Sequence, residues 1–386
     1  MNSRPTDFDV LVLGGGIAGV SVLAQIAPHL RAGLLEAEPA LAYHTTGRSA
    51  AMYAPGYGGS VVQPLTAASE AFFRGPPDGF GGPLTHARPI LHLAAPGQLD
   101  PLLAQSRERA HHRDLHWISP QEATARVPIL RPQRLTAALL DERGADIDVA
   151  RLHEGFLRQA RAAGAAVMMG LGRLHLSRTG EVWRISAEQL ELRAQVVVNA
   201  TGAWADVTAR EAGVPSQSLM PMSRTVALVD PPALPGFDGW PTVIDAEERF
   251  YFRPFTGRLL VTSANETPSP PCDAAPDEMQ AALALARFDE ACDHKVDRIV
   301  RRWAGLRTFA PDRAPVIGWS ASAPGFFWHA GLGGFGIQTA PAAARLAASL
   351  ILGAPLPGDL AEHGVDPQLY APDRDLPARR RPHRVS

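Results

Sequence analysis

The sequence predicts an α/β fold, of the α+β two-domain type, on three observations. The chain has 386 residues, which at roughly 150 residues per domain suggests two domains or three. Its N-terminal segment reads as a buried strand, a glycine-rich turn and an apolar helix, the order typical of a Rossmann-type domain. Residues 219–229 and 242–263 read as further strands, later in the chain than this N-terminal unit.

The composition is that of an ordinary globular protein. Hydrophobic residues make up 46% of the chain and charged residues 20%, enough for a core and too apolar for whole-chain disorder. The net charge of −2 lacks the positive field that general nucleic-acid binding requires. Cys272 and Cys292 form no Cys-x-x-Cys pattern and have no histidine at zinc spacing, so we expect neither a disulfide framework nor a metal site.

The apolar N-terminal segment is not expected to span a membrane. Residues 10–30 carry no charge, but four glycines interrupt them and Pro28 ends the run. The N-terminus also lacks the basic region and cleavage site of a signal peptide, so we expect a cytoplasmic protein. The arginine-rich tail, 373–386, is expected to be disordered and to allow at most a peripheral contact with the inner membrane.

A glycine motif, Gly14-x-Gly16-x-x-Gly19, follows the strand predicted over residues 8–13. In such a motif Gly14 permits the tight turn, Gly16 lets a pyrophosphate approach the backbone, and Gly19 lets the helix pack closely on the sheet. Glu36 ends the next strand, where an acid accepts hydrogen bonds from ribose hydroxyls. The motif predicts dinucleotide binding, but by itself it does not distinguish NAD from FAD.

Two later segments favour FAD. Residues 194–206 form an apolar strand that ends in Ala-Thr-Gly, and residues 326–341 form a strand, a glycine turn and the start of a helix. The N-terminus of this second helix is suited to face the pyrimidine end of a flavin and to stabilise negative charge there. FAD enzymes often begin with the glycine motif and return to the cofactor near the C-terminus, as this chain does.

With these segments in place, the sequence resembles the FAD-dependent D-amino-acid oxidase superfamily. Within it, the chain is most similar to the bacterial D-arginine dehydrogenases, which are broad-specificity D-amino-acid dehydrogenases. The segments that carry the resemblance are YHTTGRSAAMYAPGYG (43–58), LTAASEAFF (65–73), GADID (144–148), VVVNATGAW (196–204), FYFRP (250–254), WAGLRTFAPD (303–312) and GFFWHAGLGGFGIQT (325–339).

The resemblance implies a discontinuous, Rossmann-type FAD-binding domain over residues 1–88, 141–212 and 304–372. It also implies a discontinuous substrate domain over 89–140 and 213–303, built on a mostly antiparallel sheet. Some relatives attach flavin to a cysteine near the LRTFAPD segment. No cysteine lies there in this chain, so we expect noncovalent FAD. The residues that the resemblance places at the cofactor are Gly14, Gly16, Gly19, Glu36, Thr46, Arg48, Ser49, Ala50, Ala200, Gly202, Trp204, Gly333, Gly336 and Gln338.

The candidate reaction centre consists of arginines and tyrosines. Arg224 and Arg307 are flanked by apolar residues, where a surface charge is unexpected. The resemblance makes both of them ligands of the substrate carboxylate, which a guanidinium fork can bind at both oxygens. The alternative for each is a structural ion pair. The resemblance also places Tyr57 and Tyr251 around the substrate, with core aromatics as the alternative, and the backbone carbonyl of Gly334 beside its amine.

Met52, Ile90 and Ile244 are expected to line the substrate pocket. Met52 replaces a histidine of the D-arginine enzymes, and Ile90 replaces a glutamate that contacts the guanidinium of their substrate. An apolar wall cannot repay the desolvation of a guanidinium. We therefore expect D-arginine to be a poor substrate and apolar or aromatic D-amino acids to be preferred.

Two further residues bear on the chemistry. His329 lies in an apolar strand and is interpreted as a satisfied core histidine rather than as a base. Lys295, the only lysine, lies in a charged stretch that we interpret as helical. Amine oxidases place a lysine beside the flavin to assist the reaction with O2. Its position here favours a dehydrogenase that passes electrons to a quinone or another acceptor.

These observations predict an FAD-dependent D-amino-acid dehydrogenase. Hydride leaves the substrate Cα for flavin N5, and the imino acid hydrolyses to a 2-oxo acid and ammonia. Three alternatives remain at this point: an oxidase of glycine, sarcosine or a cyclic imino acid, an NAD-dependent oxidoreductase, and a flavin-binding subunit without turnover.

Overall fold

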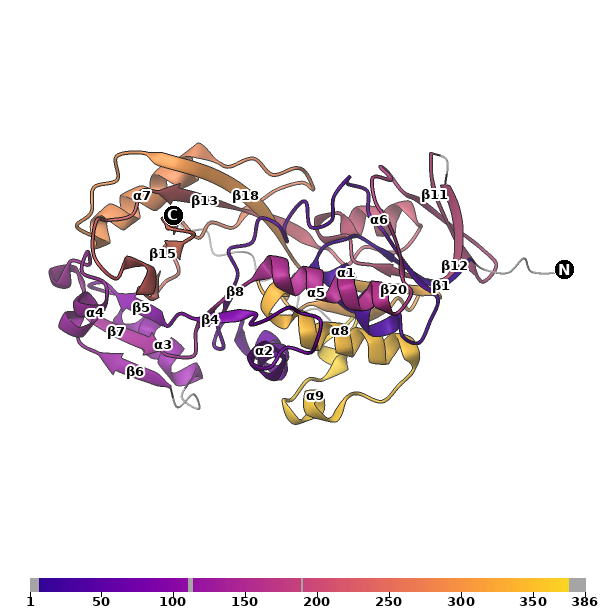
Figure 1. Ribbon diagram of the computed structural model, residues 1–386, viewed down its shortest axis with the longest axis horizontal. Helices are drawn as coiled ribbons and strands as arrows, with labels where there is room; N and C mark the ends of the chain where they lie inside the picture. The colour runs from indigo at the N-terminus through magenta and orange to yellow at the C-terminus, as the bar shows by residue number, and fades with distance from the viewer. Residues whose placement is uncertain (1–6, 110–113, 189, 375–386) are drawn as a thin grey trace.

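The computed structural model describes residues 7–109, 114–188 and 190–374. The molecule is elongated, with one large sheet in each half and a small sheet between them (Figure 1). The small sheet consists of β3 (Met52–Tyr53), β8 (Ala145–Ile147) and β4 (Thr85–Ala87). The predicted α/β fold is confirmed.

The first sheet has a parallel centre. β1 pairs in parallel with β2 and β12, β12 with β20, and β2 with β9. β11 and β19 extend it by antiparallel pairing with β12 and β20, and β10 pairs with β11. The strands are β1 (Phe8–Leu13), β2 (Ala32–Leu35), β9 (Ala166–Met168), β10 (His175–Thr179), β11 (Val182–Ala187), β12 (Leu190–Asn199), β19 (Val316–Trp319) and β20 (Phe326–Ala330).

Helices cover this sheet. α1 (Ile17–Ile26) packs against α5 (Val149–Ala162) and α8 (Gly336–Leu352), and α2 (Gly59–Arg74) packs against α8. α5 begins at an Asp148 N-cap, whose carboxylate accepts the backbone N–H of Arg151. It buries Leu152, Phe156 and Ala160, which recur at helical spacing and so share one face of the helix. α6 (Ala205–Glu211) and α9 (Gly358–Glu362) complete this half.

The second sheet is antiparallel except where β14 pairs in parallel with β5. Its strand order is β17-β13-β16-β15-β14-β5-β7-β6, and β18 pairs with β13. The strands are β5 (Ile90–Ala94), β6 (Leu115–Ile118), β7 (Ala137–Asp141), β13 (Met220–Val229), β14 (Thr242–Asp245), β15 (Tyr251–Phe255), β16 (Arg258–Thr262), β17 (Thr267–Pro268) and β18 (Ile299–Phe309). Three helices accompany it: α3 (Leu99–Glu108), α4 (Pro120–Arg126) and α7 (Glu278–Ala291).

The structure differs from two expectations. Lys295 is not helical, because α7 ends at Ala291 and the chain then enters β18, which pairs with β13 over most of its length. The expected tail begins two residues too early: Asp373 donates its backbone N–H to Gln217, and Arg374 pairs with Asp312. The rest of that tail, 375–386, lies outside the described residues.

The expected domain limits remain a prediction, and one of them, 303/304, falls inside β18. In the described part of the chain, none of the helices is long and apolar enough to cross a membrane.

Candidate active site

A single cavity of about 840 Å³ runs from the first sheet to the second. At the first sheet it is lined by the residue that follows each of four parallel strands: Gly14 after β1, Glu36 after β2, Ala200 after β12 and Gly331 after β20. Ligands of open parallel sheets bind at these carboxyl ends. The volume falls within the range of roughly 300–1,000 Å³ that is usual for ligand pockets.

The glycine motif forms a tight cradle at the start of α1. Gly14 has φ +100°, and a Cβ on it would lie 2.6 Å from the carbonyl oxygen of Ala200. Gly16 is the N-cap of α1. As a glycine it has no side chain that could accept an N–H group of the first turn. A Cβ on Gly19 would overlap the carbonyl oxygen of Gly14, so Gly19 is needed for close packing.

Three side chains hold this cradle. Glu36, at the end of β2, accepts the backbone N–H of Gly15 at 2.6 Å. Thr46 Oγ1 accepts the backbone N–H of Ile17 at 3.0 Å. His153, which the sequence did not single out, contacts the carbonyl oxygen of Gly15 through Nε2 at 2.9 Å. Burial lowers the pKa of His153, so the neutral ring donates this hydrogen bond.

The predicted cofactor residues gather here. All of them except Gly19 line the cavity. Arg48 lines the cavity, but other protein groups engage its guanidinium. It pairs with Asp273 and donates to the carbonyl oxygens of Ala274 and Ala304. Gln338 connects the 53–58 loop to α8, accepting the backbone N–H of Ala54 at 2.9 Å.

The cradle fits a dinucleotide with a flavin. Gly16 places no side chain at the start of α1, and Thr46 accepts only the N–H of Ile17 in its first turn, so the next N–H groups remain for a pyrophosphate. Glu36 lies in the position that serves ribose hydroxyls. A second helix, α8, begins at the cavity-lining Gly336 after the N-cap Phe335, and its first N–H groups also lack a side-chain cap.

Arg224 and Arg307 meet at the other end of the cavity. They lie on neighbouring antiparallel strands, where Arg224 is opposite Gly305 and Arg307 is opposite Met222. Residues two apart on a strand share a face, so the two arginines are diagonal neighbours on one face of the sheet. Gly305 has no side chain that would separate them. Both arginines line the cavity.

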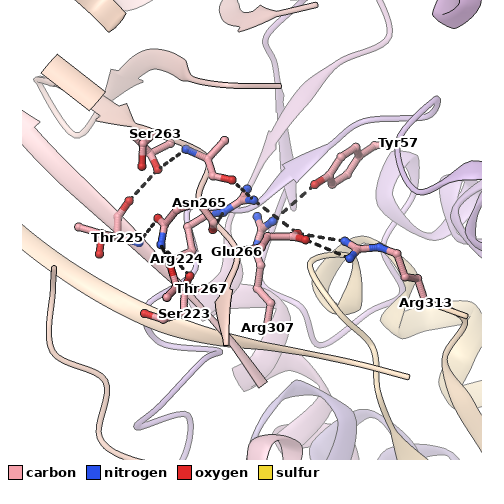
Figure 2. A network of polar contacts seen from close by, with 12 residues as sticks. Tyr57, Ser223, Arg224, Thr225, Ser263, Asn265, Glu266, Thr267, Arg307 and Arg313 are labelled. Carbon is pink, nitrogen blue, oxygen red and sulfur yellow. Dashed lines mark hydrogen bonds and ion pairs between the residues drawn. The ribbon is translucent and has the colours of Figure 1, made fainter. Parts of the chain in front are cut away.

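The hydrogen bonds of the two arginines leave donors free. Arg224 donates to the carbonyl oxygens of Ala264 at 2.7 Å and Asn265 at 3.1 Å. Arg307 has one hydrogen-bond partner among the described residues, Tyr57 Oη, at a long 3.4 Å. Figure 2 shows the two guanidinium groups beside each other, with the Tyr57 hydroxyl directed at Arg307. An anion with two oxygens would satisfy the remaining donors.

One acid lies near this pair. Glu266 forms an ion pair with Arg313 at 3.0 Å and a longer one with Arg224 at 3.5 Å (Figure 2). Burial alone would raise the pKa of Glu266, but the hydrogen bond from Arg313 and the charges of Arg313, Arg224 and Arg307 lower it. Burial and the charge of Arg307 lower the pKa of Arg224. Arg224 and Arg307 thus have one nearby carboxylate, that of Glu266, and Arg313 also pairs with it.

The other predicted residues surround this pair. Tyr57 and Tyr251 line the cavity, and Tyr57 packs edge-on against Phe335 with ring centroids 5.0 Å apart. Gly334 lies directly against Arg307, because a Cβ on it would be 2.8 Å from Arg307 Cζ.

The pocket is not wholly apolar, contrary to the expectation. Met52, Ile90 and Ile244 do line the cavity. The sequence did not single out the charged and polar side chains that line it with them: His92, Arg109, Asp141 and Glu248. They come from β5, the end of α3, β7 and the turn before β15, which are distant in sequence and adjacent in the fold.

His329 is buried, as expected of a core residue, but it is not satisfied. Neither of its ring nitrogens has a hydrogen-bond partner among the described residues. Burial lowers its pKa to about 4, so the ring is neutral near pH 7. It lines the cavity next to Ala330 and Gly331, on the cofactor side.

The sequence matches the DAO family of FAD dependent oxidoreductases over residues 9–350. The chain therefore belongs to this family, and FAD is its cofactor. A mouse pyruvate dehydrogenase phosphatase regulatory subunit is 24% identical over 62% of this chain and 29% of its own length. The glycine oxidase of Pseudomonas aeruginosa is 28% identical over 49% of this chain and 48% of its own length. The chain thus spans less than two thirds of either curated relative.

Solved structures share the fold. Glycine oxidase from Geobacillus kaustophilus has a TM-score of 0.83 at 21% identity, covering 97% of this chain and 100% of its own. L-proline dehydrogenase from P. horikoshii has a TM-score of 0.80 at 21% identity, covering 92% and 96%. Iminodiacetate oxidase from Chelativorans sp. BNC1 has a TM-score of 0.78 at 20% identity, covering 94% and 98%. These structures show a shared fold, while the match to the DAO family supports the superfamily. The closer resemblance to D-arginine dehydrogenases is not supported.

Proposed function

We propose that this FAD-dependent oxidoreductase oxidises the Cα–N bond of a D-amino acid to an imine, which water converts to a 2-oxo acid and ammonia. One observation carries the proposal: Arg224 and Arg307 are diagonal neighbours in the cavity that also contains the glycine cradle. The family resemblance favours the D form. The similar structures include a glycine oxidase, an L-proline dehydrogenase and an iminodiacetate oxidase. Glycine, proline and iminodiacetate each have a carboxylate beside a C–N bond.

The residues of the chain supply orientation. Arg224 and Arg307 bind the two carboxylate oxygens, while Tyr57 and Tyr251 enclose the bound amino acid. Bound FAD would supply the acceptor for the hydride that leaves Cα. The amine first loses one proton to solvent, so that its lone pair forms the C=N bond as the C–H bond breaks. Fixing the Cα–H direction converts a bimolecular step into an oriented one, which is a large part of the rate enhancement in such reactions.

We further propose that the electrons pass to a quinone or a similar acceptor. The side chain of Lys295 is 91% exposed and pairs with Asp297, and it does not line the cavity. This position supports a dehydrogenase rather than an oxidase that uses a lysine beside the flavin.

A second candidate is an oxidase of glycine, sarcosine or a cyclic imino acid. The 28% identity to glycine oxidase favours it. Rapid formation of H2O2 with a secondary amine would identify this activity.

An anaerobic screen tests the proposal. Purified holoprotein is mixed with D- and L-amino acids and with N-methyl amino acids, and bleaching of the flavin is recorded. Bleaching by D-amino acids supports the proposed reaction. If no compound in the screen bleaches the flavin, the proposal is wrong and a binding subunit without turnover is favoured. A preparation that lacks the flavin spectrum would instead favour an NAD-dependent enzyme.

A further inference from the structure

The substrate cavity has a polar far end. The second sheet leads to it in one row: Tyr251 on β15 is opposite Ile244 on β14, and Ile244 is opposite His92 on β5. Residues opposite each other in neighbouring strands share a face, and all three line the cavity. Two strand spacings, together about 10 Å, separate Tyr251 from His92 along this row. Glycine would fill little of that length.

A buried cation lies at this far end. Arg109 follows α3 and is only 6% exposed. Its guanidinium packs across the 53–58 loop, because a Cβ on Gly56 would overlap Arg109 Nε. Gly56 precedes Tyr57, whose hydroxyl contacts Arg307. The loop therefore links the cation at the far end to the arginine pair.

The guanidinium of Arg109 is incompletely satisfied. Nη1 contacts Nε2 of His92 at 2.9 Å, and Nε has no partner among the residues that the structure describes. Arginine can only donate, so His92 accepts through Nε2 and carries its proton on Nδ1, which also lacks a described partner. Burial and the charge of Arg109 keep the pKa of His92 well below its usual value, so the ring is neutral. Each side chain thus has a buried ring or guanidinium nitrogen without an acceptor among the described residues.

Two acids line the same end without neutralising Arg109 by contact. Among the described residues, Arg109 forms no ion pair with a carboxylate. Asp141 accepts the backbone N–H of Arg143 at 3.0 Å, and burial raises its pKa. Glu248 is exposed, at the edge of the cavity. A buried cation without a close counter-ion is unfavourable, and an anionic ligand would relieve it.

We propose that Arg109 and His92 form a subsite for a second carboxylate, so that the preferred substrates are amino acids with an acidic side chain. This inference rests on the proposed function, because it assumes that Arg224 and Arg307 hold the α-carboxylate. Ile90 and Ile244 then line the methylene groups between the two carboxylates. This proposal replaces the expected preference for purely apolar substrate side chains. The substrate side chain would cross an apolar passage and end at the Arg109 cation.

The test compares acids with their neutral amides. Flavin reduction is measured anaerobically with aspartate, glutamate, asparagine, glutamine and methionine, each in D and L form. We expect the acid to exceed its amide roughly 10- to 100-fold in kcat/KM, the range for a hydrogen bond to a charged group. Arg109→Gln is expected to remove that advantage, so that kcat/KM falls much more for the acids than for their amides or for methionine. Arg107→Gln, which alters an exposed arginine of the same helix, should retain it.

A binding measurement is independent of turnover. Glutarate and butyrate are titrated into holoprotein, and the perturbation of the flavin spectrum gives their Kd. Tighter binding of glutarate, lost in Arg109→Gln and partly kept in Arg109→Lys, supports the subsite. Equal binding of the two acids, or a preference for amides or for basic side chains, overturns it. If methionine bleaches the flavin and the acidic amino acids do not, the subsite alone is wrong. If no amino acid bleaches it, the proposed function fails as well.

Discussion

Gly334 packs against the guanidinium of Arg307: a Cβ at this position would lie 2.8 Å from both Cζ and Nη1. The glycine turn before α8 and Arg307, the proposed carboxylate ligand, are thus one packed unit. Gly334 does not have a positive φ, so alanine would be tolerated by the backbone and resisted only by the arginine.

We therefore predict that Gly334→Ala displaces Arg307 and lowers kcat/KM roughly 10- to 100-fold, the range for weakening a charged hydrogen bond. The fall in kcat/KM should come mainly from a higher KM and not from a lower kcat. Gly358→Ala is the matched control, since a Cβ at Gly358 meets nothing within 4 Å. Unchanged kinetics in Gly334→Ala would show that Arg307 does not contact the substrate.

Arg307→Lys is predicted to reduce kcat/KM by roughly 100-fold while the protein remains folded and yellow. Lysine keeps the charge but lacks the guanidinium fork that binds two oxygens. The substitution also removes the hydrogen bond that Arg307 donates to the Tyr57 hydroxyl. Arg313→Lys provides the comparison, because Arg313 pairs with Glu266 and does not line the cavity. Equal activity losses in the two variants would mean that the loss comes from a disturbed charge balance around Glu266 and not from a lost contact between Arg307 and the substrate.

Gly14→Ala is predicted to abolish FAD binding. The substitution places a side chain at φ +100° and 2.6 Å from the carbonyl oxygen of Ala200, at the cradle of the pyrophosphate. Gly180→Ala is a suitable control, since Gly180 also has a positive φ, +62°, but lies in open space. The ratio of flavin absorbance to protein should fall only in Gly14→Ala. Retention of stoichiometric FAD would contradict the assigned cradle.

FAD is predicted to be released by trichloroacetic acid. Cys292 is buried, Cys272 is half-buried, and neither lines the cavity. The supernatant after precipitation should carry the flavin fluorescence. A yellow pellet would show a covalent bond through another residue.

His329 is predicted to make the protein acid-labile. Its pKa is lowered from 6.5 to about 4 by burial, so the unfolded chain takes up a proton before the folded protein does. The stabilising contribution is complete above pH 6.5 and is lost as the pH falls toward about 4. Between roughly pH 7 and pH 5, urea unfolding should show that the wild type loses about 2 kcal/mol more than His329→Gln. Parallel pH profiles of the two proteins would exclude this role of His329.

Local pattern made much of the first sheet and of the arginine pair predictable. A strand, glycine turn and apolar helix identify β1 and α1 because each has a strong local signal. Arg224 and Arg307 were recognisable because charge in an apolar strand is unusual.

The remaining features depend on contacts between distant segments. Arg109 is one arginine in a polar segment of an arginine-rich chain, and its burial results from packing against Gly56. The stretch around Lys295 has helical composition, but pairing of β18 with β13 determines its structure. The unsatisfied ring of His329 is a property of the folded surroundings, which no local pattern encodes.

The central claim is that Arg224 and Arg307 bind the α-carboxylate beside the flavin. Its most direct test is anaerobic flavin reduction by an amino acid and by its decarboxylated amine, for example D-methionine and 3-(methylthio)propylamine. We predict that the amino acid bleaches the flavin and that the amine, which lacks the group bound by the arginines, does not. Reduction by both compounds at similar rates would contradict the claim.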